Sequence, residues 1–135
     1  MDEPIGELCV RWKIAFVKDL EVCMKVHFST WFPFGKFCAI NLFGHLIVKW
    51  ECWKRKTDRQ AAWLLNHEAI HSEQMKELWY VPFYLIYFVE WLYWAVFRTK
   101  KAYRHINFEK EAYNHQSELG YCETRKRFAQ WKSTK

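Results

Sequence analysis

His67, Glu68 and His71 are the residues of this chain whose types and spacing could do chemistry, because together they spell His-Glu-x-x-His. Two histidines four residues apart lie on one face of an α-helix, so both imidazoles can reach the same metal ion. The glutamate beside the first histidine is then placed to take a proton from a water molecule held by that ion. The pattern predicts a hydrolytic metal site in which the two histidines bind the ion and Glu68 acts as general base.

Residues 57–79 are expected to form the helix that positions this motif. Thr57 and Gln60 have the spacing of a capping box, and the negative charge of Asp58 suits the first turn of a helix. No Gly or Pro interrupts the segment. Apolar residues recur along it at helical spacing, at Ala61, Leu64, Leu65, Ala69, Met75 and Leu78. The two histidines therefore fall in the middle of a rigid element.

A third ligand is needed, because zinc sites that do chemistry usually combine three protein ligands with a water molecule. Residues 107–115 are expected to form a further helix, with Asn107 as its N-cap and Gly120 as its C-cap. This helix offers two carboxylates, Glu109 in the first turn and Glu111 on a different face. Two histidines and a carboxylate are a common set of Zn²⁺ ligands, so the segment is the expected source of the third ligand.

This segment resembles the third-ligand helix of the gluzincin metallopeptidases, in which a small residue follows the ligand glutamate at three positions and an aspartate at four. In that frame Glu109 is the third zinc ligand, with Glu111 in reserve, and Ala112 is the small residue. Tyr113 stands where the family has the aspartate. The family aspartate orients a ligand imidazole, so the resemblance leaves that role to another residue.

The order of the parts is also similar to that of a known family. A motif helix, a strongly apolar helix and a glutamate helix follow one another as in the minimal gluzincin cores of membrane-linked peptidases. More narrowly, residues 36–130 resemble small uncharacterised zincin-like proteins of Bacteroidetes bacteria. The stretches that carry this likeness are Ala39 to Gly44, the motif itself, Phe83-Tyr84 and Phe108 to Tyr113. The resemblance implies an α+β, predominantly helical fold: a minimal zincin-like core in which a short β-hairpin packs on the motif helix and two helices follow.

The N-terminal half of the chain is expected to combine a helix with two strands. Residues 37–50 are rich in branched and aromatic residues and are split by Gly44, which predicts two short strands. In gluzincin-like folds an edge strand beside the motif helix binds the substrate backbone, and residues 41–44 are its counterpart here; a hairpin that only covers the core is the alternative. Residues 1–30 are expected to hold a first helix. Its apolar residues have near-helical spacing: Val10, Ile14, Val17, Leu20 and Met24.

Residues 80–97 are the segment that could overturn the metal site, because they are apolar enough to be a marginal transmembrane candidate. A span here would place Glu109 across about 30 Å of hydrocarbon from the two histidines. We therefore expect a buried or membrane-skimming helix that turns at Pro82 and lets the glutamate helix face the motif. Its one charge, Glu90, is expected either to orient a ligand imidazole in place of the missing aspartate or to pair with a cation such as Arg104.

Length and cysteine content limit the remaining expectations. At 135 residues the chain is expected to be a single domain, 1–135. Aromatic residues make up 20% of it, and because each aromatic side chain buries a large area, a small number of residues is enough to fill the core. The five cysteines are odd in number and show no C-x-x-C spacing, so they are expected to be free thiols in a reducing compartment. No signal peptide is visible. We expect a cytoplasmic protein, with membrane association as a further expectation.

The net charge of +6 makes nucleic-acid binding a hypothesis to weigh. The basic residues flank apolar segments rather than forming one stripe, and no nucleic-acid fold motif accompanies them. We therefore expect no nucleic-acid partner and interpret the basic clusters as solvated helix ends or as contacts with an anionic membrane surface. The clusters are Lys49 to Arg59, Arg98 to Arg104 and Arg125 to Lys135.

Two functional hypotheses follow. The first is a zinc metallopeptidase acting on a peptide or protein: the two histidines and Glu109 hold Zn²⁺, Glu68 moves the water proton to the leaving amine, and Tyr113, His115 or Tyr103 stabilises the oxyanion. The second is a non-catalytic zincin-like module, structural or membrane-peripheral, with or without zinc. Fe²⁺, Mn²⁺ and Co²⁺ stay open as alternatives to zinc, because the same ligands accept them. The oligomeric state also stays open.

Overall fold

The computed structural model describes residues 8–9, 24–97 and 100–132, and its fold is α+β and predominantly helical. One sheet contains β1 (Leu8–Cys9), β2 (Lys25–Ser29), β3 (Ala39–Leu42) and β4 (His45–Lys49). The described helices are α1 (Trp50–Lys54), α2 (Asp58–Glu77), α3 (Val81–Phe97), α4 (Ala102–His105), α5 (Asn107–His115), α6 (Tyr121–Thr124) and α7 (Ala129–Lys132). The fold class predicted from the sequence is confirmed.

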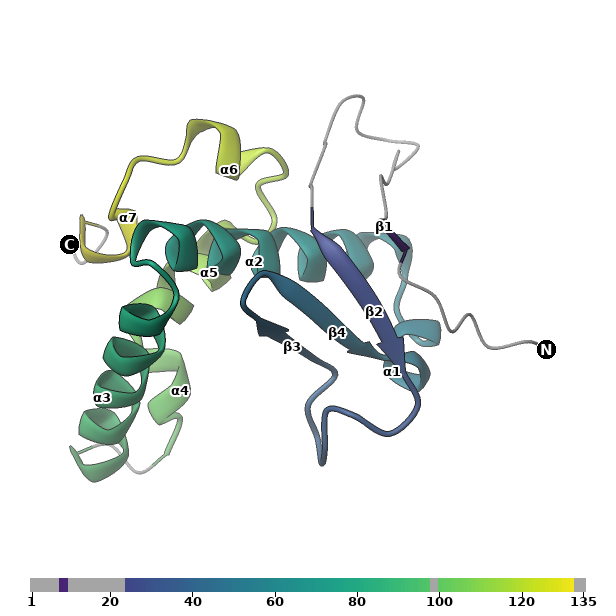
Figure 1. Cartoon of the computed structure of the whole chain (residues 1–135), viewed down its shortest axis with the longest axis horizontal. Helices are drawn as coiled ribbons and strands as arrows, with labels where there is room; N and C mark the ends of the chain where they lie inside the picture. Colours follow the sequence, from purple (N-terminus) through teal and green to yellow (C-terminus); the bar gives the residue numbers. More distant parts are fainter. Residues whose placement is uncertain (1–7, 10–23, 98–99, 133–135) are drawn as a thin grey trace.

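The β3–β4 hairpin is the pair of short strands predicted around Gly44. The sheet order is β1-β2-β4-β3, with β3 antiparallel to β4 and β2 parallel to β4. Phe43 and Gly44 form the turn, and both have positive φ, 53° and 82°, as tight hairpin turns favour. This order leaves β3 at an edge of the sheet, beside α2 (Figure 1).

The helix predicted over residues 1–30 is wrong where the structure describes this part of the chain. Strand β2 occupies Lys25–Ser29 and pairs along its whole length with β4, and at one end with β1. Met24 and Val26 are buried while Lys25 between them is exposed, which is the alternation of a strand. The main partner of β2 lies beyond the next strand in the chain, so local spacing could not reveal it. Val10, Ile14, Val17 and Leu20 lie outside the described residues.

Helix α2 begins with the capping box that its sequence predicts. The Thr57 hydroxyl accepts from the backbone N–H of Gln60 at 3.3 Å, and the Gln60 side chain accepts from the backbone N–H of Thr57 at 3.0 Å. Two donors at the start of the helix are thereby satisfied. The helix then runs uninterrupted to Glu77 and carries the motif near its middle.

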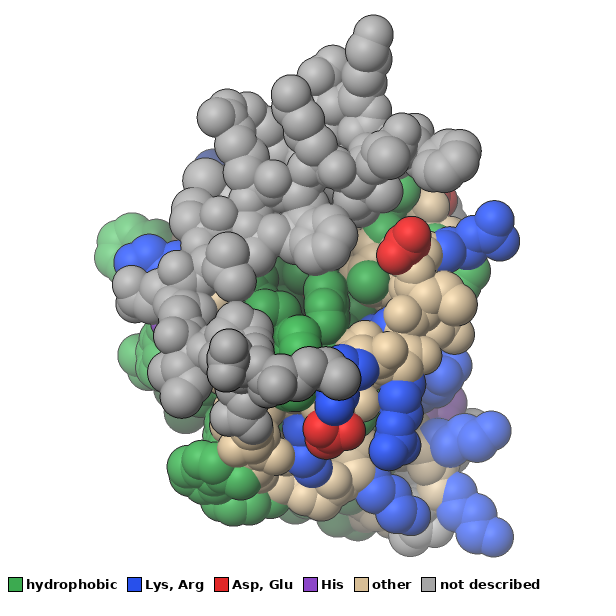
Figure 2. Space-filling model, turned by 90° about the vertical axis from the view of Figure 1, so that its right-hand side faces the viewer, with side chains coloured by type: hydrophobic (Ala, Val, Ile, Leu, Met, Phe, Trp, Pro, Cys, Tyr) green, Lys and Arg blue, Asp and Glu red, His purple; other side chains and the backbone are tan. Residues whose placement is uncertain are grey.

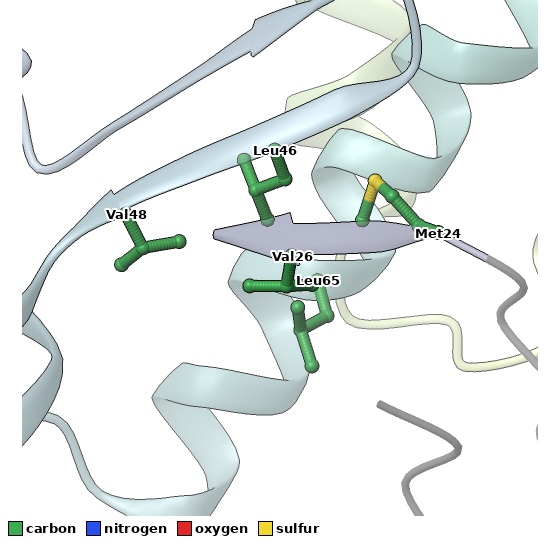
Figure 3. Packing of buried hydrophobic residues seen from close by; sticks show 5 residues of the cluster. All are labelled: Met24, Val26, Leu46, Val48 and Leu65. Atoms are coloured by element: carbon green, nitrogen blue, oxygen red, sulfur yellow. The ribbon is translucent and has the colours of Figure 1, made fainter. Parts of the chain in front are cut away.

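Helix α2 packs against two separate apolar clusters, one on each side of the motif. Its first half covers the sheet, in the cluster of Met24, Val26, Leu46, Val48 and Leu65 (Figure 3). Its last turns pack against α3 and α5, in the cluster of Met75, Phe83, Ile106 and Phe108. The histidine motif lies between the two clusters and is held by both.

Helices α2 and α3 meet at a sharp corner of 113°. Trp79 and Tyr80 form it with φ of 57° and 59°, and the N–H of Tyr80 closes the end of α2 on the carbonyl of Met75 at 2.8 Å. Pro82, the expected corner residue, lies just after it in the first turn of α3. Among the described residues no single helix is long and apolar enough to cross a bilayer, and only the bent pair of α2 and α3 has that length and composition.

The sheet end of the molecule carries a basic face. Figure 2 shows Lys and Arg side chains gathered on the side that is at the right of Figure 1, where α1 and the start of α2 lie. Exposed cations in this part of the chain include Lys54, Arg55 and Arg59. Helix α3 lies at the opposite end of α2 (Figure 1).

Candidate metal centre

The three predicted ligands meet in the interior. His67 and His71 lie one turn apart on α2, and Glu109 reaches them from the first turn of α5. The two Nε2 atoms are 3.1 Å apart, and the Glu109 oxygens lie 3.3 Å from His67 Nε2 and 3.2 Å from His71 Nε2. None of the three residues is more than 6% exposed. This buried group could hold a metal ion.

Gln74 fixes the orientation of the His71 ring. Its Nε2 donates to the carbonyl of Phe108 at 3.1 Å and to the carboxylate of Glu111 at 2.8 Å, so Oε1 is the amide atom that faces His71. That oxygen can only accept, and it lies 2.8 Å from His71 Nδ1, so Nδ1 carries the proton. When His71 is neutral, it therefore presents the lone pair of Nε2 to the centre.

Gln116 has the same role for His67, from the loop that follows α5. Its Oε1 lies 3.2 Å from His67 Nδ1. Asn66, the neighbour of His67 on α2, holds this loop, because its Nδ2 lies 3.0 Å from the carbonyl oxygens of His115, Gln116 and Glu118. Two side-chain amides thus orient the imidazoles, which is the task of the aspartate in the gluzincin pattern.

The converging atoms need a cation among them. Two imidazole lone pairs and a carboxylate repel one another unless a proton or a metal ion lies between them. Glu109 Oε2 is buried and accepts no hydrogen bond from the described residues, although His67 Nε2 lies 3.3 Å away. Two nitrogens and a carboxylate oxygen suit a divalent transition metal ion. The residues present therefore fit a metal ion at this point.

Without a metal ion, a proton can take its place. Burial alone would lower the pKa of His71, but the carboxylate of Glu109 raises it to about 9. Burial alone would raise the pKa of Glu109, but His71 and His67 hold it well below its ordinary value. At neutral pH the metal-free centre is therefore a buried ion pair.

Contacts from α3 hold Glu109 in place. The hydroxyl of Tyr87 donates to Glu109 Oε1 at 2.9 Å. The carboxylate of Glu90 accepts from the backbone N–H of Asn107 at 2.7 Å and from its Nδ2 at 3.1 Å, so it caps the start of α5. Two predictions are thereby corrected: Ile106, not Asn107, is the N-cap residue, and among the described residues Glu90 bonds the start of α5 rather than a ligand imidazole or a cation such as Arg104. The reason is that the Asn107 side chain donates to Glu90 and accepts nothing from the helix.

Glu68 lies beside the centre in a buried position. Burial raises the pKa of its carboxyl, against the smaller lowering effect of His71 and His67. Asn41 of β3 donates to the backbone carbonyl of Glu68 at 3.0 Å and lies 3.0 Å from Ser72 Oγ, which ties the edge strand to the motif helix. A buried carboxylate next to the ligands is suited to moving a proton.

Tyr113 and Tyr103, two of the three candidate oxyanion donors, border the centre. Tyr113 packs edge-on against His67 with ring centroids 4.7 Å apart, and the guanidinium of Arg104 lies 4.4 Å from the Tyr113 ring centroid. Burial, and then the charge of Glu109, raises the pKa of both hydroxyls. Both are therefore protonated at neutral pH and able to donate.

His115, the third candidate, is engaged in the loop after α5. Its Nδ1 lies 2.9 Å from Glu118 Oε2, and its ring stacks on Tyr121 with centroids 3.9 Å apart. Its catalytic role stays a prediction. Gly120, expected as the C-cap of this helix, is instead the residue before α6, because α5 already ends at His115.

Glu111, the reserve ligand, belongs to a buried ion-pair network at the end of α2. Arg125 Nε donates to Glu111 Oε1 at 2.6 Å, and Arg125 Nη1 donates to Glu77 at 2.7 Å. The charge of Glu111 is thus already neutralised by Arg125. Glu109 is the carboxylate that faces the two histidines.

Gln74, Gln116 and Tyr87 are site residues that sequence reasoning missed. Gln74 gave a signal, since it lies three residues after His71 and therefore on the same side of α2. Gln116 gave none, because its contact joins α2 to a loop that is distant in sequence. The three ligands come together as the sequence predicts.

No protein-family model, curated protein or solved structure matches this chain. The fold and the site together define an α+β protein with a buried cluster of two imidazoles and a carboxylate that could hold a metal ion. A second buried carboxylate, Glu68, lies next to this cluster.

Proposed function

We propose that this protein is a zinc-dependent hydrolase of the gluzincin type that cleaves peptide bonds. The supporting observation is the convergence of His67, His71 and Glu109, whose ligand atoms, one from each residue, all lie within 4.8 Å of one another. The two Nε2 atoms are 3.1 Å apart, and each lies 3.2–3.3 Å from a different oxygen of Glu109. Atoms that bind a tetrahedral zinc ion at about 2.0–2.1 Å lie roughly 3.3 Å from one another, which is close to the separation of the two Nε2 atoms and of each Nε2 from the Glu109 oxygen it faces. Three protein ligands leave one position for water, which is the arrangement of catalytic zinc sites.

Each residue near the centre has a role that follows from its chemistry. The zinc ion, when bound, lowers the pKa of a water molecule and polarises a carbonyl group. Glu68 would take a proton from such a water molecule and return it to the leaving amine. The protonated hydroxyls of Tyr113 and Tyr103 are the donors for the oxygen of the attacked carbonyl as negative charge develops on it. Gln74 and Gln116 keep the ligand imidazoles in the correct tautomer.

The edge of β3 offers a place for an extended peptide beside the centre. In an antiparallel pair, every second residue of an edge strand bonds its neighbour, and the residues between point their backbone groups outward. The N–H of Lys49 donates to the carbonyl of Cys38, so Ala39 and Asn41 are the residues of β3 whose backbone groups face the open edge. Tyr84 occupies one end of this edge: its hydroxyl accepts from Phe43 N–H at 2.9 Å and donates to the Asn41 carbonyl at 3.2 Å. The N–H and C=O of Ala39 and the N–H of Asn41 are left to bond an added strand.

The second candidate function is a non-catalytic module in which the ion only ties α2 to α5. Burial favours it, because Glu109 is 2% exposed and neither histidine exceeds 6%, which leaves little ligand surface for a substrate. Both functions require bound metal. They differ in whether the protein hydrolyses a substrate.

Metal analysis and a hydrolysis assay test the two functions. We expect about one zinc ion per chain by plasma mass spectrometry, lost in His67→Ala and in Glu109→Ala. Glu68→Gln should keep the metal while hydrolysis of a fluorogenic peptide mixture falls by roughly 10²–10⁴-fold. The matched control is Glu73→Gln, the same change on the same helix at a residue that pairs with Lys76 on the surface, and it should alter neither quantity.

Each outcome has its own consequence for the two functions. A folded wild-type protein that contains no metal would contradict the enzyme and the metal-tied module, and it would leave the zinc-free form of the module. Bound zinc without any hydrolysis would support the structural module and contradict the proposal of an enzyme. Hydrolysis that persists in Glu68→Gln would show that another group acts as the base.

A further inference from the structure

The outward face of α3 is apolar along its whole length. Its residues recur every three or four positions and so lie on one side of the helix. This α3 stripe consists of Val81, Leu85, Phe88, Val89, Leu92 and Val96, which are between 47% and 65% exposed. A continuous row of large apolar side chains in water is uncommon on a soluble domain and marks an interaction surface.

The opposite face of α3 packs against other parts of this chain. Phe83 is buried in the cluster that joins α3 to α2 and α5, and Tyr87 and Glu90 make the contacts that hold Glu109 and α5. Glu90 is the one charged residue among the 17 of α3, so the stripe carries no charge. Figure 1 shows α3 projecting from the end of α2, with α4 and α5 on one side of it.

Aromatic and basic residues border the stripe. Trp79 at its start is 83% exposed, and Tyr93 is 53% exposed. Lys100, Lys101 and Arg104 follow the helix and are exposed. Trp and Tyr favour the headgroup level of a bilayer, and Lys and Arg near the surface are attracted to anionic lipids.

We propose that the α3 stripe docks this protein on a membrane surface that contains anionic lipids. A helix of 17 residues is about 25 Å long and lies in the plane of the interface, with its apolar side sunk about 5–10 Å among the acyl chains. Lys100 and Lys101 then meet the phosphates at one end of the helix. The metal centre lies on the inner side of the same helix, facing away from the lipid.

A lipid surface fits the stripe better than another protein does. Protein interfaces carry about one hydrogen bond per 100–200 Å², whereas the side chains of the stripe offer no donor or acceptor. A second copy of this chain brings the same net charge of +6 and the same lysines, whereas an anionic surface is complementary to them. The stripe therefore matches acyl chains, and its border matches negative headgroups.

Cosedimentation of the full chain with vesicles tests the apolar part of the proposal. We expect binding to vesicles of phosphatidylcholine mixed with phosphatidylserine, and weaker binding to phosphatidylcholine alone. Leu85→Glu should weaken binding by roughly tenfold or more, because it places a charge in the stripe. Thr30→Glu makes the same change of charge at an exposed position between β2 and β3 and should bind like the wild type.

Paired charge reversals test the electrostatic part. Changing Lys100→Glu together with Lys101→Glu should remove the preference for anionic vesicles, with at least roughly a fivefold loss for each lysine. The control pair, Arg55→Glu with Arg59→Glu, makes the same change at two exposed positions near the start of α2, the end away from α3, and should keep that preference. If the control pair lost it instead, the basic face would be the lipid-binding surface and the proposal would be overturned.

Three further results would overturn the proposal. One is no sedimentation with either kind of vesicle, and another is an equal loss of binding in Leu85→Glu and Thr30→Glu. The third is a dimer in sedimentation velocity that Leu85→Glu dissociates, because the stripe would then be an interface between two copies. Docking does not rest on hydrolysis, so Glu68→Gln should bind vesicles like the wild type, and the two proposals can fail separately.

Discussion

Gln74 and Gln116 decide how the two ligand imidazoles point. In both pairs an amide oxygen faces Nδ1, so the proton lies on Nδ1 and the Nε2 lone pair is left for the ion. The orientation of Gln74 is itself fixed, because its Nε2 donates to Glu111. An amide partner brings no negative charge, so it makes the imidazole a weaker base than a carboxylate partner would.

Replacing Gln116 with alanine should weaken zinc binding while the protein stays folded. Gln116 Oε1 is the acceptor for His67 Nδ1, and losing such a partner typically costs about 10–100-fold in metal affinity. Competition with a chelating dye measures the affinity. Ser117→Ala, at the exposed neighbouring position, is the control and should bind zinc like the wild type. Gln116→Glu keeps an acceptor and should restore the affinity; the same affinity in all the variants would refute the orienting role.

At the scale of the elements, α3 supplies the cap of α5 from outside. The carboxylate of Glu90 receives the N–H of Asn107, a role that a residue at the helix start usually fills. Because Glu109 lies in the first turn of α5, the same contact also positions a ligand. The sequence showed that Glu90 needs a partner but not which one, since the choice depends on how α3 packs on α5.

Glu90→Ala should lower the free energy of unfolding by about 1–2 kcal/mol, the usual effect of a lost helix cap. Urea unfolding of the metal-free protein, followed by tryptophan fluorescence, measures this difference. Glu123→Ala removes an exposed carboxylate from α6 and should change stability by less than about 0.5 kcal/mol. Similar losses in the two variants would mean that the cap contributes nothing of its own.

Elements that depend on nearby residues were predictable from the sequence. The capping box at Thr57, the hairpin turn at Gly44 and the glutamate helix are all present, because their determinants lie within a few positions of one another. Strand β2 was missed because its parallel partner β4 is separated from it in the chain by β3. The same holds for Gln116 and for Arg125, whose contacts join segments that only tertiary folding brings together.

At the scale of the whole molecule, proton and metal binding link stability to pH. Glu109 raises the folded-state pKa of His71 from 6.5 to about 9. Protonated His71 therefore stabilises the metal-free fold fully below pH 6.5, and this stabilisation is lost as the pH rises toward 9. The pKa of Glu109 is lowered from 4.5, so its contribution is present above pH 4.5 and lost at lower pH. A metal ion bound at this site would replace the proton of His71 and remove the alkaline loss.

The melting temperature in the presence of EDTA should therefore fall between pH 6.5 and pH 9, by an amount that corresponds to at most a few kcal/mol. With excess zinc it should not fall over this range. Differential scanning fluorimetry measures both series. His45→Ala removes an exposed histidine of β4 and should leave the decline unchanged. A parallel decline with and without zinc would contradict the linkage.

The end of the described chain reaches the metal centre through three contacts. Arg125 pairs with Glu111, Glu111 accepts from Gln74, and the oxygen of Gln74 receives the proton of His71. The side chain of Glu111 is 0% exposed, so without Arg125 its charge would be buried and uncompensated. A protease that cut the chain just before Arg125 would therefore detach the partner of Glu111 and disturb the orientation of His71. All three candidate ligands would stay in the chain, so the geometry of the site depends on the segment that begins at Arg125.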